Sequence, residues 1–544
     1  MKRLLPLLVG LVLIGILAPS CAEQSARERL MTRYDRIEPT AEHLRMPQSV
    51  QDTIADYNKG RYYDAAIGFY TILKNPEYRG LHESARYYFT ECLYRLNLYQ
   101  ACQYELTNIL FKGPEGSAYF TSALIKLLAI TYETKDETVI FAVLSNIPLE
   151  KFPKKFRNEL IYLVGKMYFY QNQYDEAYVK FTQVDEKSAF YAKANYFKGI
   201  VEVKRKEYQK AKETFDLIKE MPVVAEEFGE SRTVKEMSKL AVGQLFYAAA
   251  HDASEDRKEE IFKAAIQYYD QVDRNNPQWF ESQFEKTWAA TMIGRYGMSL
   301  GASLTLSSPY FEDRFVPEIH LIEAITWYTL CKYGQARQTL NDFFKNYSDM
   351  HARVKKYLAK EGASYSPEKL FDDVLDQYAR GYDEQETRLP LQVLTHVLND
   401  QRFLRFYGHI EELNREAEMM QEAPKEFRDT DFFRSTMQKM DRQKMNIKKK
   451  GGAFVVQELK NVEVMLNELL GNAHNIDFEL TDSERQRLEE EERFGVEFKS
   501  RVEKSEELLL SPAVPDDSQY WPFEGEYWKD ELGYYYMAVE QECQ

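Results

Sequence analysis

Glycine and proline are scarce in this sequence, and their scarcity excludes a sheet-rich fold. Only 24 glycines and 18 prolines occur in 544 residues, whereas a protein built of many short strands needs these residues for its tight turns. Apolar residues make up 44% and charged residues 29% of the chain, which is too apolar for a disordered protein. The composition therefore predicts a folded, all-α protein with long helices.

Positive charge is also in short supply. The formal net charge is −16, and an acidic surface of this size repels phosphate backbones, so nucleic acid is not expected as a partner. The one compact basic run, Lys448 to Lys450, precedes Gly451 and Gly452. We interpret it as a solvated helix end, with a nucleic-acid or lipid contact as the alternative.

Catalytic and metal-binding motifs are missing as well. No two of the eight histidines have the zinc-binding i, i+4 spacing with an intervening Glu, and no Cys-x-x-Cys pair occurs. The sequence contains no Gly-x-Ser-x-Gly elbow, phosphate-binding loop or dinucleotide fingerprint. We therefore expect a protein that is not an enzyme and binds no cofactor or metal.

The apolar run from Leu4 to Leu17 is too short to cross about 30 Å of hydrocarbon, because a helix rises only about 1.5 Å per residue. It follows Lys2 and Arg3 and leads to Ala18-Pro19-Ser20-Cys21, as in a signal peptide. The segment resembles a bacterial lipoprotein signal, although Ala18 replaces the usual Leu. The resemblance implies a signal peptide at 1–20, lipidation of Cys21 and a linker at 21–44. An ordinary secretory signal is the alternative.

A 34-residue periodicity is the clearest feature of the remaining sequence. Gly165, Tyr174, Ala177 and Phe181 recur 34 residues later as Gly199, Tyr208, Ala211 and Phe215. An aromatic residue recurs along the chain at Tyr62, Tyr99, Tyr174, Tyr208, Phe262, Tyr296 and Tyr333. A degenerate unit near Thr138 fits the gap between Tyr99 and Tyr174, and one longer step of 54 residues precedes Phe262, so the other steps are 34 to 39 residues. Repeats of this length are typical of stacked helical hairpins.

These offsets resemble the tetratricopeptide consensus. The resemblance implies a solenoid of helical hairpins over residues 45–350, whose concave groove holds an extended peptide or a helix of a partner. In each hairpin we expect the small residue of the first helix to face the alanine of the second. Cys92 and Cys102 fall on one such hairpin, as buried free thiols or as a disulfide.

Residues 351–511 continue the helical pattern without the repeat. Leu459, Val462, Leu466 and Leu469 have a three-four-three spacing, which predicts a short coiled-coil-like hairpin within the chain or, alternatively, an oligomer interface.

Residues 512–544 form a tail bounded by prolines and rich in aromatic side chains. Trp528, Leu532, Tyr535 and Val539 share one face if the tail is helical. Its aromatic residues either dock onto the chain's own repeats or form a patch that docks a partner. The candidates for that patch are Tyr520, Trp521, Phe523, Tyr527 and Trp528.

Together these features predict a scaffold that binds other proteins of the bacterial envelope through its groove. The protein is expected to be anchored by lipid to the outer membrane and to face the periplasm, with an inner-membrane anchor as the alternative. The acylated cysteine, the repeats and the tail resemble repeat lipoproteins of motility, secretion or outer-membrane assembly complexes, faintly those of gliding motility. The alternative is an outer-membrane lipoprotein that binds glycans or other small ligands for uptake, with its tryptophans as a platform.

Overall fold

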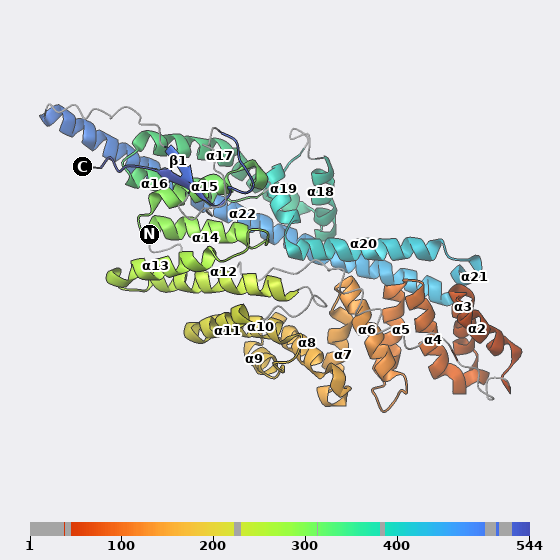
Figure 1. Cartoon of the computed structure of the whole chain (residues 1–544). Coiled ribbons are helices and arrows are strands. Elements are labelled where there is room, and N and C mark those ends of the chain that lie inside the picture. The colour runs from red at the N-terminus through yellow and green to blue at the C-terminus, as the bar shows by residue number, and fades with distance from the viewer. Residues whose placement is uncertain are drawn as a thin grey trace. The chain divides into compact units, whose positions relative to one another are not determined.

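The computed structural model describes residues 37, 45–221, 230–312, 314–380, 387–494, 507–510 and 525–543. These residues are almost entirely helical, which confirms the all-α prediction (Figure 1). One antiparallel strand pair, β1 (Glu507–Leu510) and β2 (Tyr535–Ala538), is the exception. The expected signal peptide, Cys21 and all of the linker except Ile37 lie outside the described residues.

The chain divides into two compact units. The N-terminal unit holds the described residues up to Val234 together with Arg405–Lys448, and the C-terminal unit holds Lys235–Leu404 and the described residues from Lys449 onward. Two segments that are distant in sequence thus build each unit, because a late part of the chain returns to the repeats.

Ten helices form consecutive antiparallel pairs in the N-terminal unit. They are α2 (Gln48–Asn58), α3 (Tyr62–Lys74), α4 (His82–Arg95), α5 (Tyr99–Leu110), α6 (Phe120–Thr134), α7 (Thr138–Asn146), α8 (Arg157–Tyr170), α9 (Tyr174–Thr182), α10 (Tyr191–Lys204) and α11 (Tyr208–Glu220). Three short 3-10 turns, η2 (Pro76–Leu81), η3 (Leu149–Lys151) and η4 (Lys154–Phe156), connect some of them.

The C-terminal unit continues the same pattern. Its helices are α12 (Glu230–His251), α13 (Glu255–Tyr269), α14 (Trp279–Met292), α15 (Tyr296–Leu306), α16 (Glu318–Thr329), α17 (Tyr333–Ser364), α18 (Pro367–Arg380) and α19 (Leu391–Leu398), with the 3-10 turn η5 (Pro309–Phe311). The chain then forms α20 (Gln401–Gln421), α21 (Lys425–Arg428) and α22 (Asp431–Phe494).

One turn geometry joins the two helices of six hairpins. In each of them the residue two positions before the second helix has a left-handed backbone, with φ between 58° and 76°. These residues are Gly60, Asn97, Asn172, Lys206, Gly294 and Cys331. The next amide donates to the carbonyl five residues earlier, as Leu98 N does to Leu93 O at 2.9 Å. This Schellman motif satisfies the last carbonyls of the first helix and reverses the chain at the same point each time.

A glycine on the first helix makes room for an aromatic ring of the second helix. A Cβ at Gly165 would lie 2.6 Å from the Phe181 ring, and a Cβ at Gly199 would lie 2.6 Å from the Phe215 ring. The atoms closest to each glycine therefore belong to this ring, in the place where we expected the alanine from the sequence. Ala177 and Ala211 are fully buried, but the ring four residues after each alanine fills the space beside the glycine.

In the N-terminal unit, the returning chain packs on the first repeats. Phe432 of α22 meets Phe89 of α4 with their ring centroids 4.7 Å apart. Glu416 of α20 accepts hydrogen bonds from the backbone amides of Gln100 and Ala101, both at 2.8 Å. These amides belong to the first turn of α5, which has no side-chain cap of its own. A carboxylate 315 residues away therefore caps this helix.

In the C-terminal unit, α17 and the later part of α22 lie antiparallel. Their contacts run in opposite directions, from Arg337 with Asp477 at 3.1 Å to His351 with Glu463 at 3.3 Å. Leu459, Val462, Leu466 and Leu469 are buried, so this segment pairs within the chain. Its neighbour α17 continues unbroken through residue 350, where the repeat array was expected to end.

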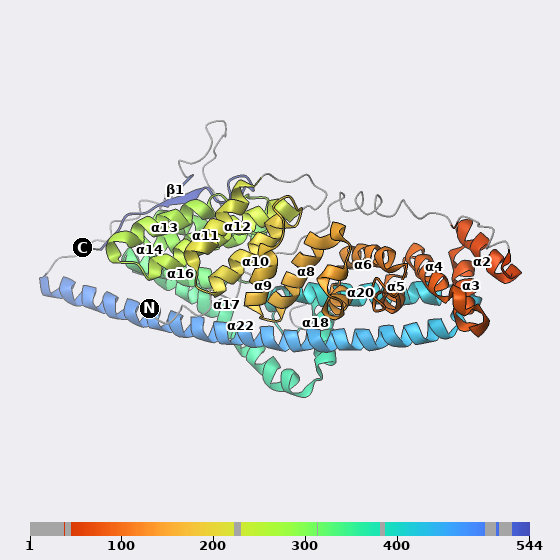
Figure 2. The same ribbon diagram turned by 90° about the horizontal axis from the view of Figure 1, so that it is seen from below.

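The helix end expected at Lys448–Gly452 does not exist, because α22 is one unbroken helix through these residues (Figure 2). A side chain at Gly452 would overlap the backbone carbonyl of Pro367. The glycine thus allows the start of α18 to approach α22 closely, and the basic run is an ordinary helical segment. Among the described residues, no helix has the length and apolar character needed to cross a membrane.

Candidate binding site

The turn aromatics found in the sequence mark the starts of second helices. Each of Tyr62, Tyr99, Tyr174, Tyr208, Tyr296 and Tyr333 is the first residue of its helix, directly after the left-handed turn. Phe262 differs, because it lies in the middle of α13 and is buried. Gly165, Ala177, Phe181, Gly199, Ala211 and Phe215 are all buried in the pairs α8–α9 and α10–α11. These residues position the helices. A ligand would therefore have to contact other side chains.

The C-terminal tail lies along α15. Side chains at Gly297 and Gly301 would overlap the carbonyls of Met537 and Tyr535. One turn further along α15, Thr305 Oγ1 accepts a hydrogen bond from Gly533 N at 3.1 Å. The three α15 residues are spaced by four and form one stripe, on which the backbone of β2 lies. The expectation of a helical tail is wrong, because β2 is extended and pairs with β1.

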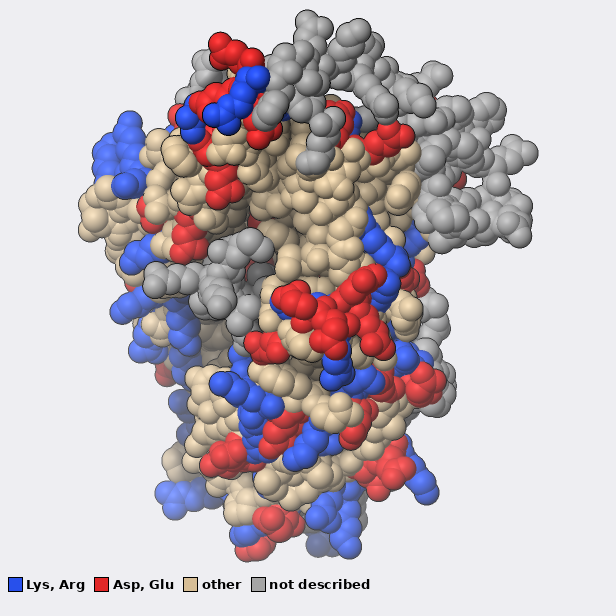
Figure 3. All heavy atoms as spheres, turned by 90° about the vertical axis from the view of Figure 1, so that its left-hand side faces the viewer, with Lys and Arg blue, Asp and Glu red and all other residues tan. Residues whose placement is uncertain are grey.

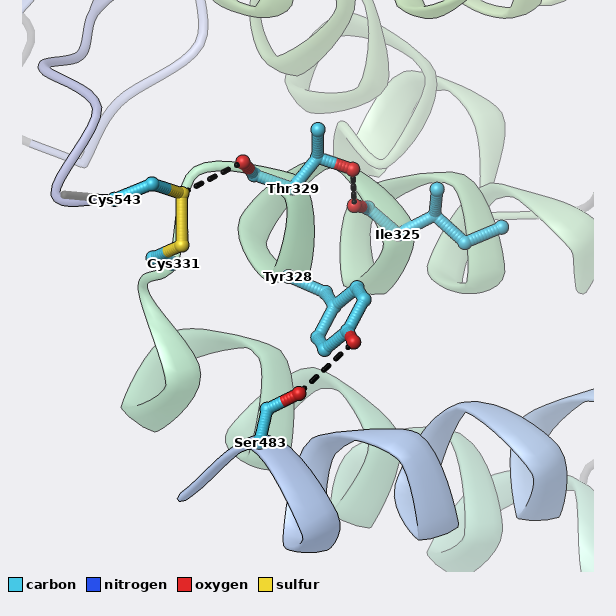
Figure 4. Close-up of a disulfide and its surroundings, with 6 residues drawn as sticks. All are labelled: Ile325, Tyr328, Thr329, Cys331, Ser483 and Cys543. Atoms are coloured by element: carbon cyan, nitrogen blue, oxygen red, sulfur yellow. Dashed lines mark hydrogen bonds between the residues drawn. A yellow bond between two sulfur atoms is a disulfide. The ribbon is translucent and has the colours of Figure 1, made fainter. Parts of the chain in front are cut away.

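A disulfide between Cys331 and Cys543 holds the end of the tail (Figure 4). Beside it, Glu542 N donates to Leu330 O at 2.9 Å, and Lys332 pairs with Glu542 at 3.2 Å. Cys92 and Cys102 are free and buried. The sequence did not indicate the pair that forms, because 212 residues separate its members.

The aromatic residues expected to dock a partner have different surroundings. Tyr520, Trp521 and Phe523 lie outside the described residues. Tyr527 packs against the buried cluster that contains Leu532 and Tyr535, whereas Trp528 is 54% exposed. The part of the tail that the structure describes is therefore mainly bound to the chain's own repeats.

Two neighbouring first helices of the C-terminal unit, α14 and α16, carry a group of carboxylates, and α12 contributes two polar side chains beside them. Glu281 and Glu285 lie one turn apart on α14, and Glu318 belongs to α16, which packs on α14. On α12, Gln244 Nε2 donates to Glu285 Oε1 at 3.3 Å. Tyr247 of α12 interacts electrostatically with Glu285 and Glu318. We call the side chains of Gln244, Tyr247, Glu281, Glu285 and Glu318 the carboxylate face.

The carboxylates of this face repel one another in a poorly hydrated environment. Burial and the neighbouring Glu281 raise the pKa of Glu285 to about 8. Burial and the same neighbour raise the pKa of Glu318 to about 7. Burial also raises the pKa of Glu281, and Arg314 offsets part of that rise. Desolvation disfavours the ionised form of each group.

No described Lys or Arg lies within ion-pair distance of these three carboxylates. Lys286, the nearest cation in sequence, pairs instead with Asp270 at 2.6 Å. By contrast, Lys and Arg lie beside Asp and Glu over much of the face drawn in Figure 3. The carboxylate face is therefore a group of acidic side chains that forms no ion pair with a described Lys or Arg.

The hydroxyl of Tyr269 adds an unused polar group to this site. Its ring packs against Gly243 of α12, where a side chain would overlap it. This pair corresponds to Gly165 with Phe181 and to Gly199 with Phe215, but a tyrosine replaces the phenylalanine. The residue is fully buried, and the hydroxyl has no hydrogen-bond partner among the described residues. Burial and the charges of Glu285 and Glu281 raise the pKa of the hydroxyl.

The described residues contain no group of three or more His, Cys, Asp or Glu side chains arranged to hold a metal ion.

For the glycan alternative, Trp279 and Trp327 are buried and Trp288 is partly buried in the core. These three side chains therefore do not form an open aromatic platform.

No protein-family model matches the chain, and no curated protein is significantly similar to it. The site is therefore interpreted from its own chemistry.

Sequence reasoning assigned no function to the residues of this site. Gly243 and Tyr269 are 26 residues apart rather than the 16 that separate Gly165 from Phe181, because α12 is a longer helix of 22 residues. A signal for the carboxylates existed, since Glu281 and Glu285 have the i, i+4 spacing that places two side chains on one helix face. Among 87 acidic residues this spacing occurs by chance many times.

Proposed function

We propose that the chain is a repeat scaffold of tetratricopeptide type, anchored by lipid at Cys21 in a bacterial cell envelope. In this role it binds other envelope proteins of a motility, secretion or outer-membrane assembly complex. The observation that carries the proposal is the recurrence of one turn motif in six helix pairs, four in the N-terminal unit and two in the C-terminal unit. Arrays of such pairs offer long surfaces made of side chains from successive first helices, which suit extended or helical protein segments.

The carboxylate face supports a protein partner over a glycan. A glycan platform needs exposed aromatic rings, whereas Trp279 and Trp327 are buried and Trp288 packs on the core. The chemistry of the carboxylate face favours basic segments, which envelope proteins can supply from loops or helices.

A crosslinked pull-down from envelope fractions of the source bacterium tests the proposal. The full chain is expected to retain a fixed set of envelope proteins, and a Cys21→Ser variant is expected to move from the membrane to the soluble fraction. Retention of no protein by the full chain would contradict the scaffold. Thermal stabilisation by envelope sugars without any retained protein would support the glycan alternative instead.

A further inference from the structure

We propose that the carboxylate face binds an arginine or lysine side chain of a partner protein, with Glu281, Glu285, Glu318 and the Tyr269 hydroxyl as its acceptors. This inference rests on the proposed scaffold function, because it names the chemistry of the segment that the repeats would hold.

The first argument is charge. Three carboxylates on two adjacent helices have no described Lys or Arg within ion-pair distance, and Glu285 is only 2% exposed. Ionising a carboxyl group that is buried without a cation is strongly unfavourable, whereas a cation brought beside it would restore the ionised form. Glu281 and Glu318 are only partly buried, so a side chain from outside can reach the group.

The second argument is the Tyr269 hydroxyl. A buried hydroxyl without a partner is uncommon and requires an explanation. The equivalent positions in the pairs α8–α9 and α10–α11 are Phe181 and Phe215, which contribute no polar atom. The repeat packing therefore does not need the oxygen, and it lies where the charges of Glu285 and Glu281 act on it.

The third argument concerns the kind of cation. The described carboxylates do not form a group that could hold a metal ion. A guanidinium has five N–H donors in a planar fork, so it can reach acceptors that are too far apart for one ion. Lysine offers three donors from a flexible stem and fits the same acceptors less specifically.

The test measures binding of a fluorescein-labelled (Arg-Ala)4 peptide to the full chain at about 150 mM salt, where long-range attraction is screened. The same peptide with citrulline in place of arginine has nearly the same shape but no charge. We expect the triple variant Glu281→Gln, Glu285→Gln, Glu318→Gln to bind the arginine peptide at least ~10-fold more weakly. The wild type should show no measurable binding of the citrulline peptide.

A matched control removes the same amount of charge elsewhere in the unit. Glu255, Glu259 and Glu260 are exposed on α13, and replacing them by Gln should change peptide affinity by less than ~2-fold. Equal losses in the two triple variants would overturn the proposal, since the peptide would then respond only to net charge. Calcium that raises the melting temperature of the wild type, but not that of the first triple variant, would overturn it in favour of a metal site.

A second variant keeps the test valid if the triple variant fails to fold. Tyr269→Phe restores the residue type of the equivalent hairpins, and we expect ~2- to 5-fold weaker binding of the arginine peptide at an unchanged melting temperature. An affinity that is unchanged in both Tyr269→Phe and Glu318→Gln would also overturn the site.

The envelope pull-down separates this inference from the proposed function. If the triple variant retains every protein that the wild type retains, the site is wrong while the scaffold stands. If the wild type retains nothing, the scaffold itself is wrong, whatever the peptide result.

Discussion

Two buried glutamates, one in each unit, have similar burial but different surroundings. Glu416 of the N-terminal unit accepts two backbone amides at 2.8 Å, whereas Glu285 of the C-terminal unit accepts one side-chain amide at 3.3 Å and faces two other carboxylates. Burial raises the pKa of both, to about 7 for Glu416 and about 8 for Glu285. A raised pKa therefore does not by itself identify a binding site. The hydrogen-bond partners distinguish the structural cap at Glu416 from the proposed binding site at Glu285.

The largest loss of stability is expected from removing Glu416, the carboxylate that caps α5. Glu416→Ala leaves the amides of Gln100 and Ala101 without an acceptor and should lower the free energy of unfolding of the N-terminal unit by about 2–4 kcal/mol. Urea unfolding at pH 8 measures this loss of free energy. Glu416→Gln keeps one acceptor oxygen and should lose less than half as much. Equal losses in the two variants would mean that charge, rather than hydrogen bonding, is what Glu416 provides.

The second prediction concerns the C-terminal unit and asks whether its stability also depends on a late segment of the chain, the strand β2. Gly301→Ala forces Tyr535 away from α15, which should cost about 1–3 kcal/mol. Hydrogen exchange of the β2 amides should become faster. Gly334 is a suitable control, because nothing lies within 4 Å of a Cβ there. If Gly334→Ala had the same effect on β2, the close approach of α15 and β2 would not be the cause.

Neutralising Glu285 should stabilise the fold, whereas removing Glu416 should destabilise it. The pKa is 4.5 for a free glutamate and about 8 for Glu285 in the fold, so the fold favours the protonated form. Wild-type stability therefore falls as pH rises from about 4.5 to about 8, while Glu285→Gln avoids that loss. We expect the variant to be about 1–3 kcal/mol more stable at pH 8 and no different at pH 4.

Melting curves of the wild type and Glu285→Gln between pH 4 and 9 measure this difference. The titrating and charged neighbours Glu281, Glu318, Tyr247, Tyr269 and Arg314 are the same in both proteins, so they largely cancel. A variant that is less stable than the wild type at pH 8 would show that the charge of Glu285 already has a partner.

The smallest change in stability is expected from Tyr269→Phe. Replacing it by Phe removes no hydrogen bond and should change the free energy of unfolding by less than about 0.5 kcal/mol. Tyr357 is a matched buried tyrosine whose hydroxyl donates to Asp373 at 2.6 Å, and Tyr357→Phe should cost about 1–2 kcal/mol. Similar losses in the two variants would mean that the Tyr269 hydroxyl has a partner after all.

Much of the local architecture could be predicted from the sequence. The spacing of aromatic residues identified where six second helices begin, because the turn before each helix is formed by interactions over five or six residues. Predictions that depended on contacts between distant residues were less successful. The partner of Gly165 was assigned to Ala177 rather than to Phe181, since spacing along a helix does not reveal which of two buried residues lies opposite on another helix.

The candidate site could hardly be predicted at all. Its members come from four helices, α12, α13, α14 and α16, and the side chains meet only when the hairpins are stacked. The tail posed the same problem, because the pattern of Trp528, Leu532 and Tyr535 fits a helical face as well as the turn and strand that form. The stripe of Gly297, Gly301 and Thr305 on α15 provides the backbone partner that favours the strand.

By itself, the sequence determined the helical class and the hairpin turns, because helix propensity, chain reversal and the periodic burial of apolar residues act over short distances. Only the tertiary structure decided the pairing of Cys331 with Cys543, the capping of α5 by Glu416 and the gathering of Glu281, Glu285 and Glu318. Each of these joins segments whose separation along the chain carries no local signal. Their meeting depends on which packed arrangement of the helices buries the most apolar surface with its polar groups satisfied.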